Sequence, residues 1–221
     1  MTYTMQNKEE VIKKFLSDLD KNGLVEMNPK IWDIELMTNI VDRIQIAPDV
    51  FTRLLEMHYS IQDSKISEDE IMLFSFVFIA RFFVSAIEYV RWILISMINN
   101  NKIKFDEQTN LGNALRLISS KLKYNKKQSL AVDNALFREL RNYLAHENYL
   151  LTKEGLTIKN NGKTTQYSLE ELTKIILELK SILEIFIAFG LKKIVELEVD
   201  IQRKEKETEA IRKIINKIQK N

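Results

Sequence analysis

The chain has 221 residues, of which 45% are hydrophobic and 29% charged, with a formal net charge of +2. This length predicts one domain with an appendage or two small domains, with enough residues for a sizeable core. Cysteine is absent, which excludes disulfides, thiolate metal sites and thiol nucleophiles. The net charge is too small to attract nucleic acid by itself, so such a partner would need a local basic patch. Glycine (5) and proline (2) are scarce, which favours long helices.

The N-terminal residues carry no apolar run behind a basic start, so no secretory signal peptide is expected and the predicted location is the cytoplasm. Residues 8–21 repeat apolar side chains at helical spacing and stop before Gly23, which predicts an amphipathic helix. Two further helices are expected at 29–47 and 48–62, each beginning at a proline suited to a first helical turn. These helices make up a predicted N-terminal extension, residues 1–65.

The clearest helix prediction begins at Ser67. Glu70, three residues later, completes a capping box, and a long apolar segment follows. Because Arg81, Glu88 and Arg91 interrupt that segment, its uncharged stretches fall far short of the roughly 20 residues that a bilayer span needs. The sequence therefore predicts a buried core helix and no membrane partner.

After the long apolar helix, the sequence predicts a loop and two helices, followed by short strands. A polar loop at 99–110 precedes predicted helices at 111–124 and 129–147. Short β-branched segments between about 149 and 167, separated by turns that contain Gly155 and Gly162, predict a small β-hairpin.

The last long helix is predicted to begin after Ser168, which forms a second capping box with Glu171. Beyond Gly190 apolar residues recur at heptad-like spacing, but too few clean heptads remain to indicate a coiled coil. Together the elements predict an all-α fold, a four-helix bundle at 66–198 with N-terminal extra helices and a small β-hairpin after the third bundle helix. A charged helical tail at 199–221 completes it, and we expect it to pack on a partner or on the N-terminal helices.

The chain has two histidines, so a catalytic imidazole would be His58 or His146. His58 has no strong base or nucleophile at a recognisable spacing and is interpreted as structural or exposed. His146 ends the segment Arg141-Asn142-Tyr143-Leu144-Ala145-His146 near the end of a predicted helix. At about 100° per residue, Asn142 and His146 share a stripe, whereas Arg141 and His146 differ by about 140°. One helix therefore cannot easily focus Arg141 and His146 on one atom, but a twofold dimer that pairs this helix with its copy could.

These residue types suit the cleavage of RNA. An imidazole that titrates near neutral pH can take a proton from a ribose 2′-hydroxyl or give one to a leaving 5′-oxygen, typically worth about 100- to 10,000-fold in rate. A guanidinium, which is always charged, can stabilise the phosphorane. Such a site needs no metal and no cofactor. The chain also has no Gly-rich phosphate loop, Ser-His-Asp arrangement or metal-ligand cluster.

The segment from Arg141 to His146 resembles the signature of the HEPN superfamily, a group of small helical bundles that includes many ribonucleases. That signature is Arg, a polar residue, a short spacer and His, and Asn142 directly after Arg141 fits it. The resemblance covers residues 67–197 and implies a HEPN-like bundle that forms a homodimer with a composite cleft. It further implies catalytic roles for Arg141, Asn142 and His146 and a 2′,3′-cyclic phosphate product. The implied setting is prokaryotic defence or a toxin–antitoxin system, with an antitoxin or activator protein as a partner.

Two other groups of polar residues could contribute to the site. On the long helix, Arg81, Glu88 and Arg91 fall on one narrow stripe with Ser85 and could line the cleft. An ion pair between Glu88 and Arg91 that satisfies itself explains that stripe equally well. The second group is basic and aromatic and suits phosphate contacts and base stacking, although a solvated loop also accounts for it. Its members, the predicted RNA-binding residues, are Lys121, Lys123, Tyr124, Lys126, Lys127 and Arg138.

The leading hypothesis is a homodimeric, metal-independent endoribonuclease. An alternative is a catalytically inactive HEPN-like RNA-binding or scaffold protein, in which Arg141 and His146 stabilise the dimer. A third hypothesis is a helical adaptor that uses the N-terminal helices and the tail. RNA cleavage products separate the first hypothesis from the second, and deletion of the residues after Asp200 tests the third.

Overall fold

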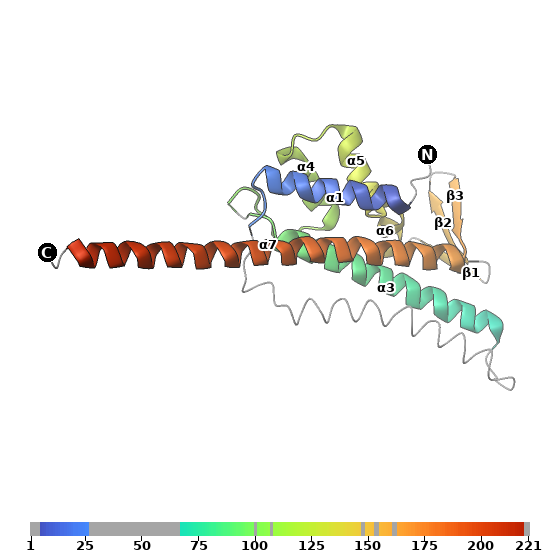
Figure 1. Cartoon of the computed structure of the whole chain (residues 1–221). Helices are drawn as coiled ribbons and strands as arrows, with labels where there is room; N and C mark the ends of the chain where they lie inside the picture. The colour runs from blue at the N-terminus through green and yellow to red at the C-terminus, as the bar shows by residue number, and fades with distance from the viewer. Residues whose placement is uncertain are drawn as a thin grey trace.

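The structure, a computed structural model, describes residues 5–26, 67–99, 101–106, 108–146, 149–152, 155–160 and 163–218. These residues form a mostly helical fold with a small antiparallel sheet, as the sequence predicts in outline (Figure 1). The helices are α1 (Met5–Lys21), α3 (Glu68–Ser96), α4 (Leu111–Lys121), α5 (Lys126–Ala135), α6 (Arg138–Ala145) and α7 (Leu169–Ile218). The helices expected at 29–47 and 48–62, and with them His58, lie outside the described residues.

The capping box that opens α3 is confirmed. The Glu70 backbone N–H donates to the Ser67 hydroxyl at 3.3 Å, and the Ser67 backbone N–H donates to the Glu70 carboxylate at 2.7 Å. These bonds satisfy two backbone groups that lack helical partners, and the bond from the Ser67 backbone lowers the pKa of Glu70. The start of the longest apolar helix before α7 is therefore fixed by local sequence alone.

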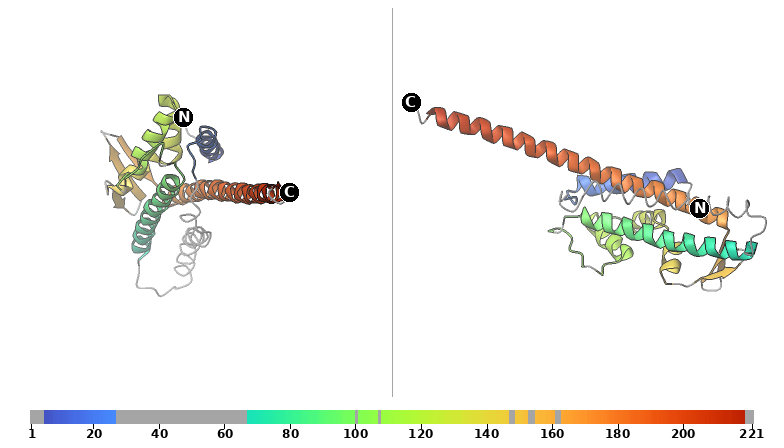
Figure 2. Two further views of the ribbon diagram at one scale, coloured as in Figure 1. Left: turned by 90° about the vertical axis from the view of Figure 1, so that its left-hand side faces the viewer. Right: turned by 90° about the horizontal axis from the view of Figure 1, so that it is seen from below.

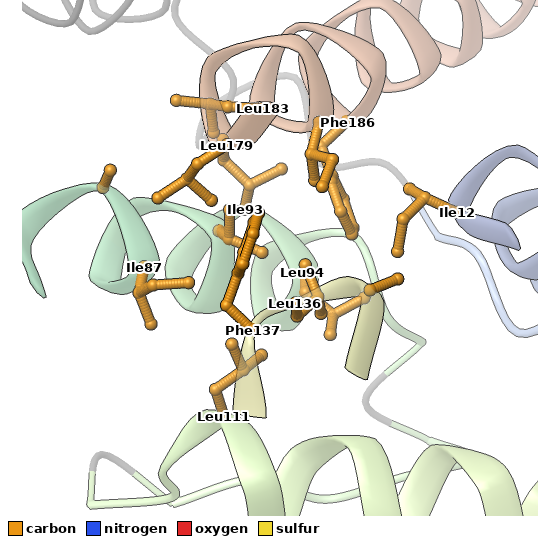
Figure 3. Packing of buried hydrophobic residues seen from close by; sticks show 14 of the residues in the cluster. Ile12, Ile87, Ile93, Leu94, Leu111, Leu136, Phe137, Leu179, Leu183 and Phe186 are labelled. Atoms are coloured by element: carbon orange, nitrogen blue, oxygen red, sulfur yellow. The ribbon is translucent and has the colours of Figure 1, made fainter. Parts of the chain in front are cut away.

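The core forms where α7 packs against α3 on one side and against α1 on the other. Figure 3 shows Ile12 of α1, Ile93 of α3, and Leu179 and Phe186 of α7 converging on one region. All four side chains are at most 1% exposed. Because α1 contributes to this core, the N-terminal helix stabilises the same hydrophobic cluster as the predicted bundle.

One face of α3 is buried and the other is not. Phe76, Phe83 and Val90 are at most 1% exposed, whereas Phe74 and Val77 are 73% and 53% exposed. The prediction of a buried core helix is therefore correct for the inner face only. By length and composition, the segment Leu73–Ser96 is also long and apolar enough to cross a membrane, and 44% of its most apolar window is buried inside the fold.

The predicted β-hairpin is a three-stranded antiparallel sheet in the order β1 (Leu150–Thr152), β2 (Gly155–Asn160) and β3 (Lys163–Tyr167). Leu156 and Ile158 of β2 are buried and join the core cluster. The meander thus closes one end of the helical body, beside the start of α7 (Figure 1).

Gly155 occupies a position in β2 that other residues cannot adopt without strain. Its φ is +139°, and a Cβ atom there would lie 2.3 Å from the Tyr167 carbonyl oxygen. We expect Gly155→Ala to lower the free energy of unfolding by about 1–3 kcal/mol, measured by urea denaturation. Gly112 of α4 is the matched control, because a Cβ there would make only ordinary contacts of 3.5 and 3.7 Å. Gly112→Ala should raise stability by about 0.5–1 kcal/mol through helix propensity, and equal effects of the two changes would contradict the geometry.

The prediction of one continuous helix at 129–147 is wrong, because the chain breaks between α5 and α6. Phe137 has a left-handed φ of 53° and no side-chain hydrogen bond that caps α6. Its ring compensates through tertiary contacts: it packs edge-on against Phe83 at 5.8 Å between ring centroids, and the Lys8 ammonium lies 4.0 Å from its centroid. Neither Gly nor Pro marks this break, so the local sequence gives no sign of it.

The last helix, α7, runs for 50 residues without interruption, through Gly190 and across the predicted boundary at 198/199. At 1.5 Å per residue it is about 75 Å long. Ile194 is the last buried residue among those described, and the helix then extends beyond the body (Figures 1 and 2). The helix therefore continues past its last buried residue among those described, and the domain boundaries at 65/66 and 198/199 stay predictions.

Candidate functional site

Arg141 of α6 is buried and tied to α5. It is 7% exposed, its Nη2 lies 2.8 Å from Asp133 Oδ1, and its Nη1 donates to the Leu136 carbonyl oxygen at 3.3 Å. The carbonyls in the last turn of a helix lack helical partners, so this guanidinium satisfies one of them at the end of α5. Arg141 therefore holds α6 against α5.

The break at Phe137 makes this contact possible. Along a continuous helix, residues eight apart are separated by about 12 Å. The break after Leu136 instead allows Asp133 and Arg141 to come into contact, and Asp133 Oδ2 also lies 3.2 Å from Arg138 Nε. One carboxylate thus binds two guanidinium groups, of which the Arg138 side chain is 51% exposed.

A pocket of about 560 Å³ lies between α4, α5 and α6. Four cationic side chains line it against a single carboxylate, that of Asp133. The cations are Arg116, Lys126, Arg138 and Arg141, and the remaining lining comes from Gly112, Leu115, Ser119, Ser120, Tyr124, Ser129, Leu130 and Asn142. The pocket is therefore a local concentration of basic side chains on a chain whose net charge is small.

His146 is exposed at the C-terminal end of α6 and does not line the pocket. Its backbone N–H donates to the Asn142 carbonyl oxygen at 3.2 Å, so the two residues occupy successive turns of one stripe. Within the described part of the chain its imidazole makes no hydrogen bond or ion pair. Asn142 lines the pocket and also lies one helical turn before His146. It therefore connects the pocket to the turn that carries His146.

The structure does not bring Arg141 and His146 together within one chain. Arg141 is buried beside Asp133, whereas His146 is exposed. This agrees with the roughly 140° that helical geometry places between them. A site that used both side chains on one phosphate would need a second copy of the chain, as the sequence predicts, or a rearrangement that releases Arg141 from Asp133.

The predicted RNA-binding residues divide into two groups. Tyr124, Lys126 and Arg138 line the pocket. Lys121, Lys123 and Lys127 are exposed outside it. Sequence inspection missed Arg116 and Asp133, which line the pocket from α4 and α5; only the positions of these helices reveal them.

The phenol of Tyr124 is already engaged. It donates to Asp18 Oδ2 of α1 at 2.6 Å, which joins the pocket wall to the N-terminal helix. Burial raises the pKa of Tyr124 well above its ordinary value, and the hydrogen bond and the charge of Asp18 raise this pKa further. The ring is therefore held in place as a neutral phenol.

Replacing Tyr124 with Phe should lower the free energy of unfolding by about 1–2 kcal/mol at pH 7, because a hydrogen bond to a charged group is lost. The pKa of Tyr124 is higher in the folded protein than in the unfolded chain, where it is about 10. The stabilisation is therefore fully present below about pH 10 and declines as the pH rises above that value. The difference between wild type and Tyr124→Phe in urea unfolding should therefore shrink between pH 7 and pH 11. An equal difference at both pH values would contradict this role.

The polar stripe of α3 satisfies itself. Arg91 Nε lies 2.6 Å from Glu88 Oε2, and Arg91 Nη1 donates to the Thr109 carbonyl oxygen at 3.2 Å. Arg81 is exposed, and none of Arg81, Glu88 and Arg91 lines the pocket. The ion-pair explanation therefore fits the contacts, and a place for these residues in a cleft stays a prediction.

Metal ligands do not cluster in this part of the molecule or elsewhere in the residues that the structure describes. Among them, no three or more His, Asp or Glu side chains gather in a group that could hold a metal ion.

Comparisons of this chain with protein-family models, curated proteins and solved structures found no match.

Proposed function

We propose that this protein is an endoribonuclease that cleaves RNA without a metal ion. The observation that carries the proposal is the position of Asn142, which lines a pocket with four cationic side chains and lies one helical turn before the exposed His146. A phosphate held at the mouth of this pocket would lie near an imidazole that no other described group engages. Cationic side chains hold the RNA backbone, and an imidazole moves protons near neutral pH.

The proposed reaction balances within the RNA strand. The ribose 2′-oxygen forms a bond to phosphorus and loses its proton to a base, while the bond from phosphorus to the 5′-oxygen breaks and that oxygen gains a proton. The products are a 2′,3′-cyclic phosphate and a 5′-hydroxyl. His146 serves one of the two proton transfers, and His146 of a second copy in a homodimer serves the other.

The two arginines then have different roles. Arg141 is buried and paired with Asp133, so we assign it a positioning role. It holds α6 in place, and with α6 the side chains of Asn142 and His146. Arg138 shares the same carboxylate but is half exposed, so it can reach a phosphate from the pocket rim. A direct catalytic role for Arg141, as the HEPN resemblance implies, requires its release from Asp133.

The test is incubation of the purified chain with single-stranded RNA in excess EDTA. We expect discrete fragments, and no cleavage of a matched strand whose 2′-hydroxyls are replaced by hydrogen, because the attacking oxygen is then missing. Cleavage of both strands would contradict attack by the 2′-oxygen, and a requirement for added Mg²⁺ would contradict a metal-independent site.

The second candidate function is RNA binding without cleavage. The bond between Arg141 and Asp133 favours it, since a guanidinium that is already neutralised by a neighbouring carboxylate stabilises a phosphorane less well. This candidate predicts complexes with intact RNA under all conditions. A role in prokaryotic defence or a toxin–antitoxin system, with an antitoxin or activator, rests on the resemblance alone.

A further inference from the structure

The pocket between α4, α5 and α6 has more positive charge than its own carboxylate can balance. Asp133 already binds Arg141 and Arg138. Arg116 and Lys126 are exposed and make no hydrogen bond or ion pair with another residue that the structure describes. Two uncompensated cations on facing helices create a site for an anion.

The rest of the lining suits the other parts of a nucleotide. Leu115 and Leu130 provide apolar surface, and Leu130 is 41% exposed. Ser119 and Ser129 provide hydroxyls that can donate to or accept from a sugar or a base. A volume of about 560 Å³ lies within the range of roughly 300–1,000 Å³ typical of small-ligand pockets.

We propose that this pocket binds one unpaired ribonucleotide unit, with its phosphate at Arg116 and Lys126 and its base against Leu115 and Leu130. This inference rests on the proposed function, because it names the part of the RNA strand that the protein holds beside Asn142. A base inside an A-form duplex is stacked and paired and cannot enter a pocket, whereas an unpaired base in a loop or a single strand can. The protein should therefore select unpaired RNA.

The charge requirement is tested with fluorescently labelled single-stranded RNA and a His146→Ala background, which keeps the strand intact. We expect Arg116→Glu and Lys126→Glu each to weaken binding about 10-fold and to reduce the dependence of affinity on salt by about one counterion. Lys127→Glu is the matched control, because Lys127 is the exposed neighbour of Lys126 but does not line the pocket. It should weaken binding less than about threefold.

The steric requirement is tested at Gly112, where an added Cβ atom would lie 3.7 Å from Arg141 Nη2 at the pocket wall. Gly112→Met should fill the pocket and weaken RNA binding about 10-fold without changing any charge. Gly112→Ala adds only one methyl group with ordinary contacts and should weaken RNA binding less than Gly112→Met does. A duplex of the same sequence should bind at least about 10-fold more weakly than the single strand.

A nucleotide unit can come from an RNA strand or from a free nucleotide, and competition distinguishes the two. If adenosine 5′-monophosphate displaces the labelled RNA, the pocket also accepts free nucleotides; if only unlabelled RNA displaces it, the pocket is a subsite of the strand. Either result supports the proposal when Gly112→Met weakens binding of the labelled RNA about 10-fold. Equal RNA affinity in Gly112→Met, Arg116→Glu and Lys127→Glu would overturn it. The proposed function can fail while this inference holds. In that case the wild-type protein would leave RNA intact, but RNA binding would still be weakened by the pocket variants.

Discussion

Replacing His146 with Ala is expected to slow RNA cleavage by about 100- to 10,000-fold, the usual contribution of a general acid or base. The imidazole is exposed and makes no side-chain bond within the described residues. Its removal should therefore leave the free energy of unfolding within about 0.5 kcal/mol of wild type and leave RNA affinity unchanged. Single-turnover cleavage in EDTA, with thermal unfolding alongside, measures both effects.

His58→Ala is the control for this experiment, because His58 is the other histidine in the chain. It should cleave RNA at a rate within about twofold of wild type, as expected for a residue with no chemical role. A His146→Ala variant that cleaves as fast as wild type would assign the proton transfers to another group. If His146→Ala unfolded or lost RNA binding, the loss of cleavage would have a structural cause.

Asp133→Ala is expected to cause the largest loss of stability. It removes the carboxylate that neutralises Arg141, whose side chain is 9% exposed, and leaves a buried charge with no opposite charge beside it. Breaking such a pair costs about 3–5 kcal/mol when both groups are fully buried. Because the Asp133 side chain is 21% exposed, we expect about 3 kcal/mol, or a fall in Tm of roughly 6–12 °C for a chain of this size.

Two further variants show whether the buried pair is the cause. Arg138→Ala removes the exposed partner of the same carboxylate and should cost less than about 1 kcal/mol. The double variant Asp133→Ala/Arg141→Leu leaves no unpaired charge in the interior, since Arg138 is half exposed, so it should be more stable than Asp133→Ala alone. If the double variant lost the sum of the effects of Asp133→Ala and Arg141→Leu measured singly, the two residues would act independently, contrary to their 2.8 Å contact.

Those parts of the fold that depend on local signals could be predicted from the sequence. The capping boxes at Ser67 and Ser168 were both expected, and hydrogen bonds of 2.7–3.3 Å confirm them. The strands after residue 149 were also expected, because β-branched residues and turn glycines mark them. In each case, residues within a few positions of one another determine the structure.

Those parts that depend on tertiary packing could not be predicted. The break at Phe137 has no local signal, since contacts with Phe83 and Lys8 stabilise its left-handed backbone. The contact between Asp133 and Arg141 follows from that break and was missed with it. Helical periodicity did separate Arg141 from His146 in advance, but it gave no indication that Arg141 would be buried.

The residues that line the pocket also divide into those that could be predicted from the sequence and those that could not. Lys126 was expected to bind RNA because basic residues cluster around Tyr124 in the sequence, and Arg138 was also among the predicted RNA-binding residues. Arg116 lies on a separate helix and joins them only through the packing of α4 against α5. A basic patch built from several helices cannot be identified from charge along the chain.

The most direct test of a metal-independent ribonuclease is the chemistry at the ends of RNA fragments that wild type produces in excess EDTA. We expect a 2′,3′-cyclic phosphate on one side of each cut and a 5′-hydroxyl on the other, with no such fragments from His146→Ala. Intact RNA, or fragments with 3′-hydroxyl and 5′-phosphate ends, would contradict cleavage by the 2′-oxygen at this site.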